Sequence, residues 1–159
     1  MSFGRESRFQ EIHVVPFRTL LDERGILKEA TFPPRNPDPS KQREMLHRVL
    51  FWFWHELSHF TAALGRDQLW WAYGQLEAMR AMCVNLARIE QGRSAEDEAY
   101  EKLDEAISTT QLSALRATHC PMERRAMARA GRDILHFYRE RAPLVARANG
   151  LHYPADSIN

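Results

Sequence analysis

The fold depends most on residues 48–92, which read RVLFWFWHELSHFTAALGRDQLWWAYGQLEAMRAMCVNLARIEQG. Across residues 40–64 there is no proline or glycine, and apolar residues recur every three or four positions, as on one face of an α-helix. Gly65 is suited to end this helix, and Asp67 is suited to cap a second helix that continues to about Gln91. These residues therefore predict two antiparallel helices joined by a tight turn.

The residues after this hairpin add further helical signals. The highly charged stretch that follows predicts a loop and then a short helix at about residues 96–107. Pro121 suits the first turn of a longer helix that runs to about Arg141, after which Pro143 either kinks it or starts a new short helix. The sequence thus predicts a mainly α protein, an up-and-down bundle of four to five helices over residues 41–159.

The N-terminal residues predict a small β segment ahead of the bundle. Residues 8–17 alternate in polarity and are rich in β-branched and aromatic side chains, which predicts a strand, and Gly25 can supply the turn of a hairpin. Four prolines lie in residues 33–40, which predicts an extended linker after a β segment at residues 1–32. Because an exposed strand edge invites pairing with another copy, we expect a homo-oligomer.

Composition limits the partners and the compartment that we expect. The chain has 22 Lys and Arg against 21 Asp and Glu, so its net charge of +1 gives no electrostatic argument for nucleic acid or an anionic membrane. The N-terminus lacks the apolar stretch of a signal peptide, and no run reaches transmembrane length, so we expect a cytoplasmic protein. Cys83 and Cys120 are too few for a disulfide framework and are expected to be reduced packing residues.

The sequence His-Glu-Leu-Ser-His at residues 55–59 is the pattern most suggestive of chemistry. On a helix it places His55 and His59 one turn apart, where they can bind zinc, with Glu56 as the general base of a small hydrolase. The predicted hairpin brings Glu77 to the height of His55, so Glu77 is a candidate third ligand. Two other interpretations stay open: a hydrogen-bonded pair of His55 and Glu77, or a ligand cavity lined by His55, Glu56 and Glu77.

The order of the helical motifs resembles a known family. The segments FWFW, Gly-Arg-Asp, LWWA and LEAMR, followed by YEKLDEAI, ALRATHCP and AGRDILHFYRERAPLVARANGLHYP, are similar to the C-terminal, substrate-binding half of aminoglycoside and lincosamide nucleotidyltransferases. The resemblance covers about residues 45–154. Upstream, EIHVVPFRTLLDERGIL resembles the last strand and hairpin of the family's catalytic domain, and Glu11 matches the position of a third metal-supporting carboxylate.

The resemblance implies a helical domain that presents carboxylates and aromatic faces to a cationic antibiotic, groups that suit ammonium ligands. The candidate substrate-binding residues are Trp70, Trp71, Tyr73, Glu77 and Arg80, together with His55 and Glu56. The family's Gly-Ser turn and paired aspartates, which hold Mg²⁺ and the nucleotide, do not occur in this sequence. We therefore expect no catalysis by the chain alone, and Mg²⁺ and nucleotide only with a separate catalytic nucleotidyltransferase chain.

Overall fold

The computed structural model describes residues 39–93, 99–100 and 102–153. These residues form helices and contain no strand, which confirms the mainly helical prediction for the described part of the chain. The helices are α2 (Pro39–Gly65), α3 (Leu69–Glu90), α4 (Leu103–Ala106), α5 (Thr109–Ala117) and α6 (Arg124–Ala148). The predicted strand and hairpin, Glu11 and all but the last two residues of the predicted linker lie outside the described residues.

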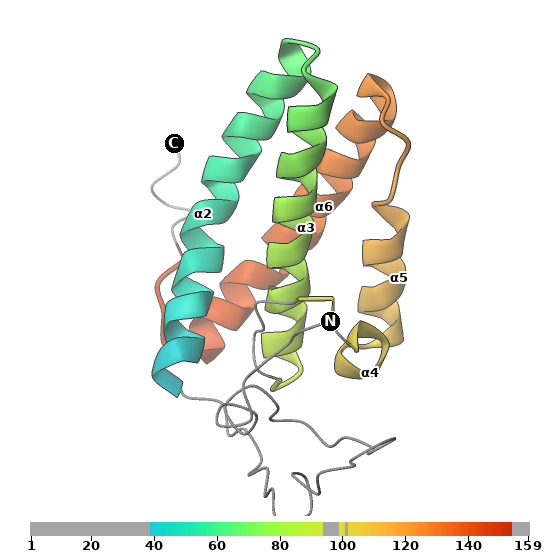
Figure 1. The fold of residues 1–159 in the computed structure, drawn as a ribbon. Coiled ribbons are helices and arrows are strands. Elements are labelled where there is room, and N and C mark those ends of the chain that lie inside the picture. The colour runs from blue at the N-terminus through green and yellow to red at the C-terminus, as the bar shows by residue number, and fades with distance from the viewer. Residues whose placement is uncertain (1–38, 94–98, 101, 154–159) are drawn as a thin grey trace, which may run out of the picture. The chain divides into compact units, whose positions relative to one another are not determined.

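The four longer helices alternate in direction along the bundle, as Figure 1 shows. Helices α2 and α3 run antiparallel and side by side, and α6 slants behind α3, so that α3 contacts both of its long neighbours. Helix α5 lies beside α3 and α6, and α4 is a single turn before it. None of the described helices is both long enough and apolar enough to cross a membrane.

The core is made where α2, α3 and α6 meet. The ring of Phe53 from α2 stacks on Tyr138 from α6 with 3.6 Å between ring centroids. The Tyr138 hydroxyl donates a hydrogen bond to the carbonyl oxygen of Leu50 at 2.9 Å, so its one polar group is satisfied inside the core. All three side chains are buried, and this contact fixes α6 against the middle of α2.

Each of the three long helices ends in the same backbone motif. After α3 and α6, Gly92 and Gly150 take left-handed φ angles of 69° and 65°, which glycine adopts without steric cost. Asp67 takes that place after α2 with φ 59°, and the amide of Gln68 donates back to the carbonyl of Ala63 at 3.0 Å. The prediction that Asp67 caps the next helix is therefore wrong, because Gln68 is the N-cap of α3.

The second half of the bundle differs from its sequence prediction. Within the predicted helix at residues 96–107, the described residues form only the single turn α4, and a helix that was not predicted, α5, follows it. A capping box begins α5: the Ser108 hydroxyl accepts from the Gln111 amide at 3.2 Å, and the Gln111 side chain accepts from the Ser108 amide at 2.9 Å. Pro143 lies inside α6, so no separate helix begins there.

Two glycines provide a matched test of this packing. A methyl group at Gly131 of α6 would lie 2.5 Å from Cε1 of the buried Phe60 ring, whereas a methyl group at the exposed Gly74 of α3 would meet nothing within 4 Å. We expect Gly131→Ala to lower the free energy of unfolding by about 1–3 kcal/mol through overpacking. Gly74→Ala should raise it by about 0.5–1 kcal/mol through helix propensity. Urea unfolding measures both, and changes of the same sign would contradict this packing.

Tyr138 makes the stability depend on pH in the alkaline range. Burial raises the pKa of Tyr138 above its usual range, so the folded state keeps the neutral phenol while the unfolded chain ionises near pH 10. The stabilisation is therefore present below about pH 10 and is lost as the pH rises further, by about 1.4 kcal/mol per pH unit for one proton. Urea unfolding between about pH 9 and 11 should show a shallower loss for Tyr138→Phe, and an unchanged slope would contradict this account.

Candidate functional site

A buried arginine organises the polar side chains around the middle of α3. Arg80 is only 1% exposed, and its Nε donates to the Thr118 hydroxyl at 2.8 Å while its Nη2 donates to the Thr118 carbonyl at 2.9 Å. Its Nη1 pairs with the carboxylate of Glu77, one turn earlier on α3. Arg80 thus joins α3 to the residue that ends α5 and fixes one carboxylate oxygen of Glu77.

Glu77 stands at the edge of this cluster, with 33% of its side chain exposed. Its second oxygen accepts from the hydroxyl of Tyr100 at 3.4 Å, at the long end of the hydrogen-bond range. Burial raises the pKa of Tyr100, although the positive charge of Arg80 opposes that shift, and so Tyr100 remains a neutral donor at neutral pH.

Two more of the predicted residues share this side of α3. Tyr73 lies four residues and Trp70 seven residues before Glu77, spacings that put all three on one helical face. Trp70 is 81% exposed, so its indole is not a core side chain, whereas Tyr73 is half-buried and packs against the core. We call the surface formed by Trp70, Tyr73, Glu77 and Tyr100 the Glu77 face.

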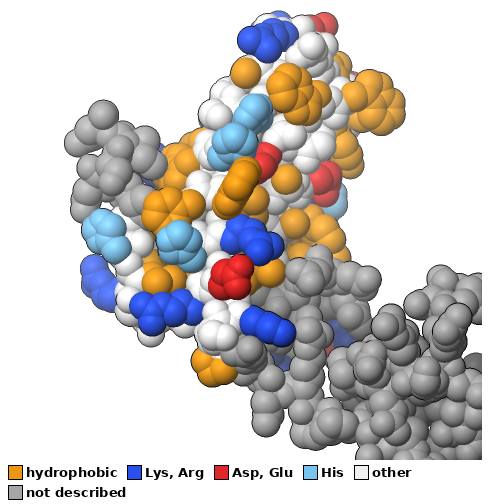
Figure 2. Space-filling view, turned by 60° about the vertical axis from the view of Figure 1, so that its left-hand side comes forward, with side chains coloured by type: hydrophobic (Ala, Val, Ile, Leu, Met, Phe, Trp, Pro, Cys, Tyr) orange, Lys and Arg blue, Asp and Glu red, His pale blue; other side chains and the backbone are white. Residues whose placement is uncertain are grey.

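The other predicted residues lie on a different face of the α2–α3 hairpin. The side chains of Trp52, His55, His59 and Trp71 form a row of ring contacts, which we call the ring row. Successive centroids in it are 4.9, 4.4 and 5.7 Å apart. Phe51, Trp52 and His55 line a shallow hollow of about 150 Å³ beside it. Figure 2 shows a face of the molecule on which histidine side chains lie among exposed hydrophobic ones.

Glu56 meets a glutamine of α3, Gln75, that no sequence pattern singles out. With the Gln75 amide oriented to satisfy its neighbours, its nitrogen donates to Glu56 and its oxygen accepts from Trp71 Nε1 at 3.1 Å. The residue of α3 that meets Glu56 is therefore Gln75, whereas Glu77 is engaged with Arg80 and Tyr100 on another face.

The predicted grouping of Glu77 with the two histidines is accordingly wrong. Among the described residues, no group of three or more His, Cys, Asp or Glu side chains is placed to hold a metal ion. The described residues also lack the predicted hydrogen bond between His55 and Glu77 and the predicted cavity lined by His55, Glu56 and Glu77. Gln75, which meets Glu56, and Glu77 are about 200° apart around α3 at 100° per residue. Zinc binding by His55 and His59 themselves stays a prediction.

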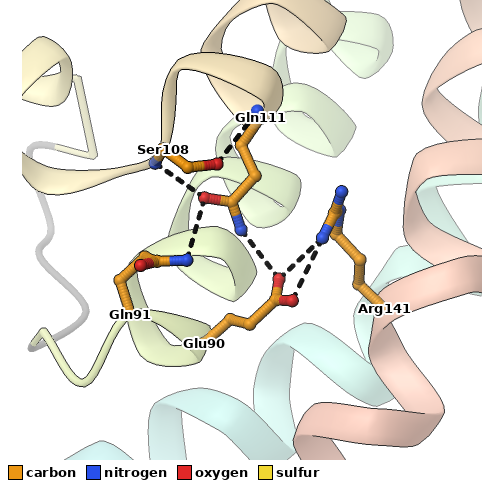
Figure 3. A network of polar contacts seen from close by, with 5 residues as sticks. All are labelled: Glu90, Gln91, Ser108, Gln111 and Arg141. Atoms are coloured by element: carbon orange, nitrogen blue, oxygen red, sulfur yellow. Dashed lines mark hydrogen bonds and ion pairs between the residues drawn. The ribbon is translucent and has the colours of Figure 1, made fainter.

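A second polar network, shown in Figure 3, joins the end of α3 to α5 and α6. The carboxylate of Glu90 accepts from Gln111 at 2.8 Å and from Arg141 at 2.9 and 3.1 Å. The Gln111 oxygen accepts from the Ser108 amide and, at 3.3 Å, from Gln91. Since Gln111 is 2% exposed and bonded at both ends of its amide, this network is structural, and the Ser-x-x-Gln capping pattern is the sequence signal that points to it.

Comparisons of the chain with protein-family models, with curated proteins and with solved structures found no match. The Glu77 face and the ring row are therefore the two surfaces whose own residues indicate a function. Tyr100 and Thr118 were missed by sequence reasoning, because they lie 20 or more positions from Glu77 and Arg80 and carry no local pattern of their own.

The pairing of Arg80 and Glu77 predicts an asymmetric response to mutation. Glu77→Ala leaves the buried guanidinium of Arg80 without its counter-charge, so we expect the free energy of unfolding to fall by about 1–3 kcal/mol. Combining it with Arg80→Met removes the buried charge, and this double variant should be more stable than Glu77→Ala alone. Asp133→Ala, at an exposed carboxylate of α6, is the control and should change stability by less than about 0.5 kcal/mol. Guanidinium unfolding that ranks the double variant below Glu77→Ala would contradict this account.

Proposed function

We propose that this chain is a cytoplasmic helical binding domain for a positively charged small molecule, of the kind found in aminoglycoside nucleotidyltransferases, and that it acts with a separate catalytic chain. The observation that supports this most is the Glu77 face. There a carboxylate oriented by a buried arginine lies on the same helical face as exposed aromatic side chains.

Arg80 gives Glu77 a fixed direction without occupying both of its oxygens. One oxygen is held by Arg80, and the other meets only the hydroxyl of Tyr100 among the described residues, across 3.4 Å. An ammonium group can displace so long a contact, because a charge-assisted hydrogen bond to a carboxylate is shorter and stronger than a neutral one. The site thus needs little rearrangement to accept a cation.

The aromatic residues Trp70 and Tyr73 make the Glu77 face long enough to contact a ligand of several rings. At a rise of 1.5 Å per residue, Trp70 and Glu77 are separated by about 10 Å along α3, with Tyr73 between them. An indole that is 81% exposed offers its face to a cation, and a cation over a tryptophan or tyrosine ring is attracted by about 0.5–2 kcal/mol. A linear molecule with two or more ammonium groups can engage both ends of the Glu77 face.

Catalysis in this proposal belongs to a partner. The sequence lacks the Gly-Ser turn and paired aspartates of nucleotidyl transfer, so Mg²⁺ and the nucleotide would be held by a catalytic chain while this domain presents the acceptor. The zinc hydrolase alternative has less support, because its general base, Glu56, is hydrogen-bonded by Gln75.

Calorimetry and NMR titration test the proposal with an aminoglycoside and a neutral oligosaccharide of similar size. We expect saturable binding of the aminoglycoside alone, weakened by salt because the attraction is partly ionic. Glu77→Gln should lower the affinity at least about tenfold, which corresponds to about 1.4 kcal/mol, and Trp70→Ala should also lower it. Asp133→Asn, an exposed carboxylate of α6, should have no effect. Binding that is absent, or equal in Glu77→Gln and the intact chain, would reject the proposal.

A further inference from the structure

We propose that His55 and His59 form a two-imidazole site for a late first-row divalent transition-metal ion, Cu²⁺, Ni²⁺ or Zn²⁺, on the surface of α2 and between the indoles of Trp52 and Trp71. The site does not involve Glu77 and is independent of cation binding at the Glu77 face. The proposal begins from the contact between the two imidazole rings, whose centroids are 4.4 Å apart.

The two rings are placed for chelation by the helix itself. Residues four positions apart lie above one another on a helical face, so both imidazoles project from adjacent turns of one rigid element. His55 is exposed and His59 is half-buried, so an ion can reach them from solvent. Within the described part of the chain, their contacts are with aromatic rings, and neither imidazole is engaged in a hydrogen bond or ion pair.

The other described histidines do not offer this arrangement. His47 has Phe51 at the next turn of α2, and the two rings are 4.3 Å apart. His136 pairs with Glu140 at 3.2 Å, and neither His119 nor His152 makes a ring contact with another described histidine. Among the described residues, His55 and His59 are therefore the histidine pair whose rings touch.

Coordination chemistry determines which ions fit. Neutral imidazole is a ligand for copper, nickel and zinc, whereas Mg²⁺ and Ca²⁺ prefer oxygen, and the usual order of affinity puts Cu²⁺ above both Ni²⁺ and Zn²⁺. Two protein ligands leave the remaining positions of the ion open to water or a small ligand. Gln75 donates to one oxygen of Glu56, and the proposed site needs only the two imidazoles as protein ligands.

The neighbouring indoles allow metal binding to be measured by tryptophan fluorescence. Trp52 contacts the His55 ring and Trp71 contacts the His59 ring, so a Cu²⁺ ion held by both imidazoles lies close enough to quench tryptophan fluorescence. Titrating the tag-free full chain with CuCl₂ should give saturable quenching with one ion per chain, and NiCl₂ should bind more weakly. In NMR spectra, ZnCl₂ should shift the imidazole resonances of His55 and His59 first.

Single substitutions separate chelation from nonspecific binding. His55→Ala and His59→Ala should each lower the Cu²⁺ affinity at least about tenfold, whereas His47→Ala, an exposed histidine of the same helix, should leave it unchanged. Circular dichroism checks that each variant is folded. The proposal is overturned if either His55→Ala or His59→Ala keeps full affinity, or if His47→Ala loses it. Glu77→Gln should bind Cu²⁺ normally and His55→Ala should bind the aminoglycoside normally, so failure at one face is distinguishable from failure at the other.

Discussion

A guanidinium that is 1% exposed sets the strongest constraint on this bundle. A buried charge is tolerated only where its donors are satisfied, and Arg80 meets that condition through the hydroxyl and carbonyl of Thr118 and the carboxylate of Glu77. The end of α5 must therefore lie beside the middle of α3. The same bonds fix the direction of Glu77, so the packing of the bundle and the geometry of its best candidate site share one cause.

The first two helices of the bundle could be predicted from sequence, because their signals are local and strong. An uninterrupted apolar period predicted a helix over residues 40–64, and α2 spans Pro39–Gly65. The turn was misassigned for a local reason: aspartate favours the N-cap, yet Asp67 here takes a left-handed φ of 59°, a conformation that aspartate tolerates less well than glycine. The segment after α3 was harder, because α5 buries little besides Gln111 and Leu115 and its apolar period is correspondingly faint.

The sequence offers candidate residues for a site, but it does not group them as the structure does. Spacing along α3 puts Trp70, Tyr73 and Glu77 on one helical face, because residues four and seven positions apart lie above one another on a helix. The prediction that Glu77 opposes His55 required the rotation of α3 about its own axis as well as its register with α2. Rotation is set by the whole core, and it brings Gln75 rather than Glu77 against Glu56. Sequence spacing within one helix is therefore a firmer guide to this site than pairing across the hairpin.

Directed polar contacts attach α5 to the rest of the bundle, alongside the apolar packing of Leu112 and Leu115. At its start, Gln111 bonds to Glu90, and at its end Thr118 accepts from Arg80. Hydrogen bonds of this kind specify position more sharply than apolar contacts do, because their strength falls steeply with distance and angle. Tyr100, whose hydroxyl donates to Glu77, lies in the chain between α3 and α5. Arg80 therefore links the position of α5 to the direction of Glu77, because the same guanidinium donates to Thr118 and to the Glu77 carboxylate.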